Sequence, residues 1–141
     1  MKKRVLFLCT GNSCRSQMAE GLVDHYLGDE RKAYSAGTRP SGYVHPLAVQ
    51  AMSDLGIDIA LQRSKSIEGF READFDTVVT VCDDAAENCP VWLGKGRTVH
   101  IGFEDPALAT GSYEERLAVF RQVRDQIRHK IFGLLANGSQ G

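Results

Sequence analysis

One segment near the start of the chain combines a cysteine, an arginine and a serine at a spacing that suits oxyanion chemistry. It reads Cys9-Thr10-Gly11-Asn12-Ser13-Cys14-Arg15-Ser16. Five residues separate Cys9 from Arg15, which is enough for a loop whose successive N–H groups point inward at an anion. Gly11 and Asn12 tolerate the positive φ that such a curl requires. Arg15 adds a planar fork that suits two oxygens of a tetrahedral oxyanion.

The same segment predicts that Cys9 is a nucleophile. A thiol at the centre of this positive field is expected to have a pKa below its free value of about 8.5. Ser16 is within reach to donate a hydrogen bond to the thiolate, and we expect the whole loop from Thr10 to Ser16 to bind the oxyanion. The loop lacks the Gly-Lys-[Ser/Thr] ending of a nucleotide P-loop, which argues against ATP or GTP.

A candidate acid lies far along the chain, in Phe103-Glu104-Asp105-Pro106. A thiolate nucleophile is usually paired with a separate group that protonates the leaving oxygen. An Asp-Pro pair alone indicates only a turn. Beside the Cys9 loop, however, Asp105 is the carboxylic acid that this chemistry needs.

Two further cysteines, Cys82 and Cys89, are separated by six residues. Structural zinc sites usually place about two to four residues between paired cysteines, so we expect no metal. From the residues alone, buried thiols and a redox pair both stay open. If residues 83–88 are helical, the pair is about 10.5 Å apart along the helix axis. A disulfide needs Cα atoms within about 7 Å, so bonding the pair would unwind that helix.

Strand and helix patterns alternate along the chain. Val5–Leu8 is a continuous apolar run, typical of a strand buried on both faces. The other expected elements are strands over 33–36, 77–81 and 98–101, and helices after Ser16, over 45–55 and over 112–135. They predict an α/β fold: a single domain over residues 1–141 with a four-stranded parallel sheet flanked by helices. Ligands bind at the carboxyl ends of such strands, where Cys9, Cys82 and the Asp105 segment lie.

The last predicted helix begins with a capping box formed by Ser112 and Glu115. Its expected buried stripe contains Leu117, Phe120, Ile127, Ile131 and Leu134. Several cationic side chains fall largely on this helix, and we interpret them as its solvated face: Arg116, Arg121, Arg124, Arg128 and Lys130.

Composition excludes several classes of protein. The chain has 17 Lys and Arg against 18 Asp and Glu, so its net charge of -1 gives no broad attraction to nucleic acid or an anionic membrane. The run Val5–Leu8 is shorter than the about 20 residues of a membrane span or the about 7–15 of a signal peptide. We expect a cytoplasmic protein, in which cysteines are catalytic more often than cross-linked. The sequence shows no repeated apolar surface pattern, and we expect a monomer.

The motif Cys-Thr-Gly-Asn-Ser-Cys-Arg-Ser-Gln-Met-Ala-Glu-Gly, residues 9–21, resembles the active-site loop of the low-molecular-weight protein tyrosine phosphatase superfamily. More closely it resembles the thioredoxin-coupled arsenate reductases on that fold. The similarity covers nearly the whole chain, including residues 34–37 and 57–59 and the stretches around Cys82 and Asp105. Ordinary phosphatases of the superfamily lack the second cysteine pair, and an aromatic residue commonly follows their Asp-Pro motif, where this chain has Ala107.

The resemblance implies arsenate reduction. Cys9 would form a covalent arsenate adduct, with Arg15 holding oxygens and Asp105 giving the proton. Cys82 and then Cys89 would carry the oxidation away as disulfides. Thioredoxin would be the external dithiol, although the sequence itself does not exclude glutaredoxin, and no bound cofactor is needed. The alternatives are a phosphatase for phosphate monoesters, which needs only Cys9, Arg15 and Asp105, and a non-catalytic anion or redox sensor.

Some arsenate reductases of this kind bind potassium beside the loop, with Glu20 at one of the matching positions. Lys65 stands where an aspartate is expected. An ammonium group there would repel a cation and could itself neutralise Glu20. We therefore expect no activation by potassium.

Overall fold

The computed structural model of the chain describes residues 2–83 and 90–138. Cys89 and the segment 84–88 lie outside the described residues, so the expected unwinding of that segment stays a prediction. Within the described part, no helix is both long and apolar enough to cross a membrane.

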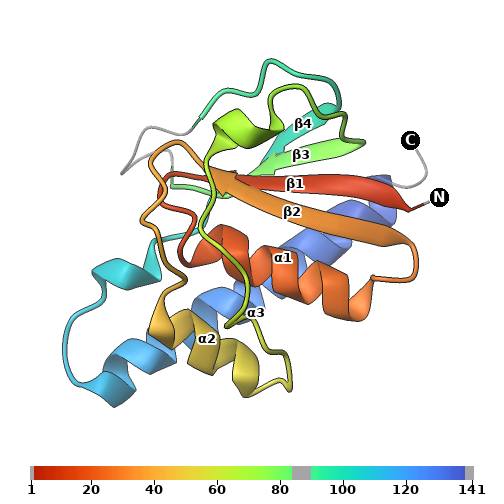
Figure 1. Cartoon of the computed structure of the whole chain (residues 1–141). Helices are drawn as coiled ribbons and strands as arrows, with labels where there is room; N and C mark the ends of the chain where they lie inside the picture. The colour runs from red at the N-terminus through yellow and green to blue at the C-terminus, as the bar shows by residue number, and fades with distance from the viewer. Residues whose placement is uncertain (1, 84–89, 139–141) are drawn as a thin grey trace.

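The sheet has four parallel strands, as the sequence predicts, and the structure gives their order as β2-β1-β3-β4 (Figure 1). The strands are β1 (Lys3–Cys9), β2 (Arg31–Gly37), β3 (Thr77–Thr80) and β4 (Arg97–His100). Successive strands are added on opposite sides of β1, so the chain leaves β1 and β3 in different directions. This strand reversal opens a crevice at the carboxyl ends of β1 and β3, which is where α/β proteins bind ligands.

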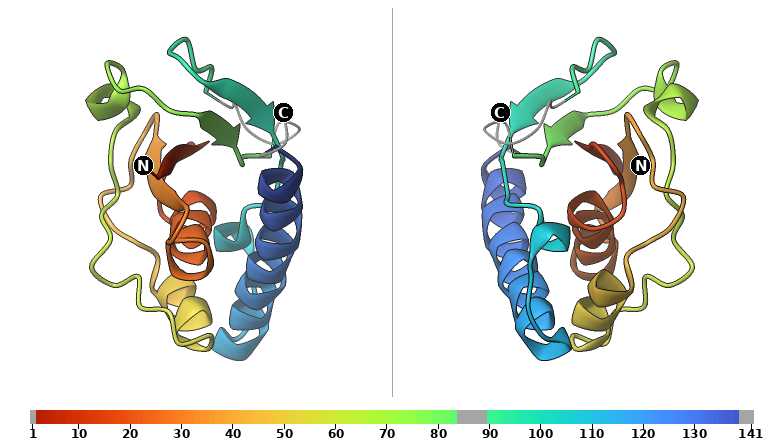
Figure 2. Two further views of the ribbon diagram at one scale, coloured as in Figure 1. Left: turned by 90° about the vertical axis from the view of Figure 1, so that its right-hand side faces the viewer. Right: turned by 90° about the vertical axis from the view of Figure 1, so that its left-hand side faces the viewer.

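Three α-helices cover one face of the sheet (Figure 2). They are α1 (Arg15–Tyr26), α2 (Pro46–Ser53) and α3 (Tyr113–Gly138). The short 3-10 helix η1 (Ile67–Phe70) lies toward the opposite face, and η2 (Pro106–Leu108) lies on the helical side, near the start of α3. The layers explain why the strand nearest the centre is apolar on both sides.

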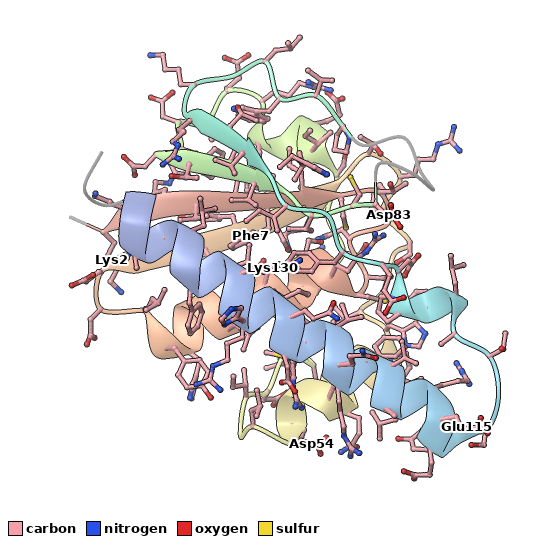
Figure 3. All side chains as sticks on the ribbon, turned by 180° about the vertical axis from the view of Figure 1, so that it is seen from behind. Lys2, Phe7, Asp54, Asp83, Glu115 and Lys130 are labelled. Carbon is pink, nitrogen blue, oxygen red and sulfur yellow. The ribbon has the colours of Figure 1, made fainter. Side chains whose placement is uncertain are left out.

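β1 is buried on both faces, as its apolar run predicts. Val5 and Phe7 pack among the helices, and Figure 3 shows Phe7 between the sheet and α3. Leu6 and Leu8 pack on the other side with Phe75 and Trp92. Because β1 is clamped from two directions and paired on both edges, Cys9 at its end has a fixed position.

The observed element boundaries differ from the predicted ones by one to three residues, which is typical of element ends. The expected helix over 45–55 is shorter, because His45 caps it and the chain turns at Gly56 with φ of 78°. The expected strands at 77–81 and 98–101 each end one residue earlier. The predicted capping box is confirmed: Glu115 N donates to Ser112 Oγ at 3.1 Å and Ser112 N to Glu115 Oε1 at 3.2 Å.

Two details of the α3 prediction are wrong. Leu135, not Leu134, is the deeply buried leucine at the end of the stripe, and Leu134 packs only partly against the core. Arg124 is not solvated: it is 8% exposed and its Nη1 donates to Ala51 O at 2.7 Å. The carbonyl at the end of α2 gives this guanidinium a buried partner, which helical spacing alone does not reveal.

Candidate active site

The oxyanion loop, residues 9–16, joins the end of β1 to the first turn of α1. Four successive carbonyl groups of the loop accept hydrogen bonds from the segments around it. Thr10 O accepts from Arg39 N at 2.9 Å, and Gly11 O accepts from Ser41 N at 2.9 Å. Asn12 O accepts from Gln17 Nε2 at 3.0 Å, and Ser13 O accepts from His45 N at 2.9 Å. The outer side of the loop is therefore fully engaged by protein.

The amide groups of the loop turn inward as a consequence. In a trans peptide the N–H points opposite to the preceding C=O, and the described residues contain no cis peptide. Asn12 demonstrates this directly, because its N–H donates to Cys9 Sγ at 3.2 Å. Its φ of 48° is the only positive value of a non-glycine residue in the described chain. The loop thus has the backbone geometry of an anion nest.

Gly37, at the end of β2, allows the loop to sit this close to the sheet. A Cβ at this position would collide with the carbonyl oxygen of Thr10. Any other residue would push the loop away from the strand, because the colliding atom belongs to the backbone of Thr10 and cannot move aside as the end of a flexible side chain can.

Cys9 is 2% exposed, and its sulfur is surrounded by hydrogen-bond donors. Ser16 Oγ lies 2.9 Å from Cys9 Sγ, so the predicted reach of this hydroxyl is confirmed. The N-terminal end of α1 begins at the following turn and adds the positive end of its dipole.

Arg15 and Asp105 meet on the open side of the loop. Arg15 is 4% exposed, and its Nη1 donates to Phe103 O at 3.1 Å. Its Nη2 lies 3.7 Å from Asp105 Oδ2. The other carboxylate oxygen, Oδ1, accepts from Ala107 N at 3.0 Å, so Asp105 caps η2. The segment after β4 thereby carries the acid and also holds the arginine.

These groups enclose one cavity of about 230 Å³, lined by residues 9–15 and Asp105. It has room for an anion of five heavy atoms, since one water occupies about 30 Å³. The predicted binding residues Thr10 to Arg15 line it. Ser16 does not line it: this residue is fully buried behind Cys9 and contacts the sulfur instead.

The three cysteines that the structure describes are in different states. Cys9 and Cys14 are free thiols, whereas Cys82 takes part in a disulfide. Burial raises the pKa of Cys14 to about 12, which keeps this thiol protonated and unreactive. Cys82 is fully buried two residues after the end of β3. β3 pairs with β1, the strand that ends in Cys9. Cys89 is outside the described residues.

The segment 62–66 lies against the back of the loop, and the sequence pattern does not predict its contacts there. Ser64 Oγ donates to Gly11 O at 3.1 Å, and Lys65 N donates to Asn12 Oδ1 at 2.7 Å. Gln17 is fully buried and contacts both Asn12 and the carbonyl of Arg63, although the sequence assigns no role to this side chain. No local pattern indicates the contacts with the segment 62–66, because 46 to 53 residues separate the partners.

Lys65 lies beside Glu20, as we expected from their positions. Its Nζ is 3.6 Å from Glu20 Oε1, and Ser35 Oγ donates to the same oxygen at 2.6 Å. Burial raises the pKa of Glu20, while Ser35 and Lys65 oppose that rise. The ammonium group therefore supplies positive charge to a poorly solvated carboxylate. Among the described residues, no group of histidine, cysteine and acidic side chains is arranged to hold a metal.

Comparison with known proteins identifies the family to which this fold and loop belong. The family model described as low molecular weight phosphotyrosine protein phosphatase matches residues 4–139. The chain belongs to this family, and its α/β fold is the one that the sequence predicts.

Individual relatives within and around this family have more specific names than the family model. The chain is 53% identical over 130 residues to an arsenate reductase of Halalkalibacterium halodurans, covering 92% of this chain and 93% of the relative. A solved arsenate reductase in a phosphate-binding state matches with a TM-score of 0.80 and 36% identity, covering 96% and 98% of the two chains. A thioredoxin-dependent arsenate reductase of Corynebacterium glutamicum matches with a TM-score of 0.62 and 26% identity, covering 96% of this chain and 63% of that one.

Proposed function

We propose that this protein reduces arsenate to arsenite through a covalent intermediate on Cys9. The observation that carries the proposal is the placement of Cys9 inside an amide-lined cavity with Arg15 and Asp105 at its mouth. Arsenate and phosphate are both tetrahedral oxyanions, and a similar reductase binds phosphate. The similarity to arsenate reductases supports arsenate as the substrate to be reduced.

The first step is an attack of the Cys9 thiolate on arsenic. The loop amides and Arg15 hold the oxygens of the anion and stabilise charge that develops on them. One oxygen leaves as water after Asp105 donates a proton, and a sulfur–arsenic bond forms. Arsenic is still pentavalent at this stage, so no electron has moved.

Reduction occurs when a second thiol attacks the Cys9 sulfur. We propose that Cys82 is this thiol: the Cys9–Cys82 bond forms, the sulfur–arsenic bond breaks, and its electron pair leaves with arsenic as arsenite. Cys89 then attacks Cys82, Cys9 departs as a thiolate, and the disulfide becomes Cys82–Cys89. The position of Cys82 after β3, next to β1, and its participation in a disulfide support this assignment.

The test is NADPH consumption with arsenate, thioredoxin and thioredoxin reductase, with phosphate replacing arsenate as the control. Cys9→Ser should lower the rate by about a thousandfold or more, since it removes the nucleophile. Cys82→Ser should stop after the adduct, and Cys89→Ser should release one arsenite per enzyme without recycling. Turnover by the Cys89→Ser variant at the parent rate would contradict the relay.

The external reductant is proposed to be thioredoxin, by similarity to the thioredoxin-dependent relative. Glutaredoxin with glutathione is the comparison arm of the same assay, and a faster rate with it would overturn this choice. A reaction that consumes a reduced dithiol fits a cytoplasmic location, where dithiols are kept reduced. We expect a monomer, which light scattering can check.

We also propose that the reaction needs neither a cofactor nor potassium. The Lys65 ammonium is placed 3.6 Å from Glu20 Oε1 and supplies the positive charge that a cation would otherwise bring. The turnover rate should therefore be the same in potassium and in choline chloride at constant ionic strength. A several-fold rise in potassium would contradict this expectation.

Phosphate monoester hydrolysis is a second candidate activity, favoured by the same three groups. Cys9, Arg15 and Asp105 suffice to form and hydrolyse a phosphocysteine without a redox step. An aryl phosphate should be hydrolysed slowly, at a rate unaffected by Cys82→Ser. If this hydrolysis is fast and arsenate causes no NADPH consumption, the protein is a phosphatase rather than a reductase.

A further inference from the structure

A line of side-chain amides runs from a partly exposed segment to the sulfur of Cys9. Gln62 Nε2 donates to Gln17 Oε1 at 2.8 Å, and Gln17 Nε2 donates to Asn12 Oδ1 at 3.0 Å. Asn12 Nδ2 then donates to Ser16 Oγ at 2.8 Å. Ser16 Oγ lies 2.9 Å from Cys9 Sγ. Gln17, Asn12 and Ser16 are all fully buried, so water does not compete for these bonds.

The direction of the line is fixed by one backbone group. Lys65 N–H can only donate, and it points at the side chain of Asn12 from 2.7 Å, so the Asn12 atom facing it must be the oxygen. The Asn12 amide nitrogen consequently faces Ser16 and donates to its hydroxyl. The hydroxyl hydrogen of Ser16 is then free to point at Cys9 Sγ. Every bond in the line runs toward the sulfur, as an anionic sulfur requires.

Gln17 has a second function in this arrangement. Its Nε2 also lies 3.0 Å from the Asn12 carbonyl oxygen and 2.7 Å from the Arg63 carbonyl oxygen. One side chain thus holds both the backbone and the side chain of Asn12, the residue with φ of 48°. That conformation is unfavourable for most side chains and persists only where the surroundings hold it. It is also the conformation from which Asn12 N–H reaches Cys9 Sγ.

We infer that Gln17 is a positioning residue for the nucleophile. It holds Asn12 so that the Asn12 backbone N–H acts on Cys9 directly and the Asn12 amide acts on Cys9 through Ser16. Gln62 lies at the outer end of the line, where its Nε2 donates to the Oε1 and the backbone carbonyl of Gln17. The inference rests on Cys9 being the nucleophile of the proposed function, and on no property of the reductant or of Cys82.

The test replaces Gln17 by methionine, which has a similar length and volume but neither donates nor accepts strongly. The first readout is alkylation of Cys9 by iodoacetamide at neutral pH, in a chain that also carries Cys82→Ser and Cys89→Ser. Without Gln17, Asn12 should no longer be held in the position from which its N–H reaches Cys9 Sγ. Gln17→Met should therefore slow this alkylation by about tenfold, the effect expected when a thiolate loses one hydrogen bond. The matched control is Gln50→Met, at an exposed glutamine of α2 whose side chain donates to Asp54 Oδ1 at 3.2 Å.

The second readout is steady-state arsenate reduction with the three other cysteines in place. Gln17→Met should lower kcat by about tenfold and leave KM for arsenate within about threefold, because the oxygens are held by Arg15 and other loop amides. Gln62→Met removes only the two outermost bonds, to Oε1 and the backbone carbonyl of Gln17, and should give a smaller loss, about twofold to threefold. This variant keeps the test available if Gln17→Met does not fold.

A parent-like alkylation rate in folded Gln17→Met would overturn the inference, even if the variant is less stable. So would a rise in KM with kcat unchanged, which would assign Gln17 to anion binding alone. The alkylation assay needs no arsenate. Failure of the proposed function would appear as absent NADPH consumption with the alkylation effect intact, so the two failures are distinguishable.

Discussion

The two sides of the oxyanion loop are built differently. At the back, Asn12, Ser16 and Gln17 are fully buried and linked by hydrogen bonds of 2.8 to 3.0 Å. At the front, the Asp105 side chain is 29% exposed and lies 3.7 Å from Arg15. In the proposed mechanism the back orients groups that keep their places during the reaction, whereas the front carries the proton donor, which exchanges with solvent.

The two sides suit the two tasks that the proposed mechanism divides between them. Preorganised donors are effective only where water is excluded and the groups cannot rearrange, and the donors at the back lie between β2, α1 and the segment 62–66. A general acid needs renewed protons, and the proposed acid Asp105 lies at the mouth of the cavity, at the N-cap of η2. Changing the front should therefore alter proton transfer and leave the reactivity of Cys9 unchanged.

The largest expected effect comes from the front. Asp105→Asn should lower kcat for arsenate reduction by about a hundredfold to a thousandfold, because the leaving oxygen loses its proton donor. Alkylation of Cys9 by iodoacetamide should stay within about threefold of the parent, because the long, partly exposed pair with Arg15 contributes little. A large fall in both kcat and the alkylation rate would show that Asp105 also affects the reactivity of Cys9, and that the two sides of the loop do not act separately.

A smaller effect is expected behind the loop, at Lys65. Lys65→Met removes the positive charge beside Glu20 and should cost about 1 to 2 kcal/mol of unfolding free energy at pH 7, measured in urea. Because the pKa of Glu20 is raised from 4.5, the folded state holds this proton more tightly, and stability falls as the pH rises above 4.5. The variant should therefore match the parent near pH 4 and diverge at neutral pH.

The control for that experiment is Lys3→Met, at an exposed lysine at the start of β1. It should show no pH-dependent difference from the parent. An equal loss of stability in the Lys65→Met variant at both pH values would mean that Lys65 acts through packing of its alkyl chain, and not through its charge on Glu20.

The smallest effect is expected at His45, which caps α2 through Nδ1 accepting from Leu47 N at 3.1 Å. Burial and then Arg116 lower the pKa of His45 from 6.5, against an opposing effect of Asp105. The unfolded chain therefore binds a proton first, and this contribution to stability is lost as the pH falls below 6.5.

His45→Asn keeps a capping acceptor without a titrating ring. The Tm of the parent should fall more than that of this variant between pH 7.5 and 5.5, by about one or two degrees. Equal falls would show that protonation of His45 does not open the cap or disturb its backbone bond to Ser13.

Much of the fold could be predicted because its signals are local. The apolar run of β1 indicates burial on both faces, and Ser112 with Glu115 marks the start of α3. Boundaries were less predictable, since an end such as that of α2 depends on where the chain packs next. Arg124 shows the same limit: its partner, the Ala51 carbonyl, belongs to another helix.

The local sequence is enough to predict the chemistry that we propose for the loop. Cys9, Arg15, Gly11 and Asn12 all lie within the eight consecutive residues 9–16, so the motif can be recognised without the fold. Asp105 could be named from a short motif because the loop defines which acid the reaction needs.

The contacts that hold the loop in place come from segments that are distant in the sequence. Gln17 follows the motif directly, yet its partners include the carbonyl of Arg63, 46 residues away, and Asn12 is fixed by Lys65 N, 53 residues away. A buried amide finds whichever carbonyl the packing brings to it, because hydrogen bonds require proximity in space and not in sequence. The proposed nucleophile can thus be named from a local motif, whereas its orientation depends on the whole fold.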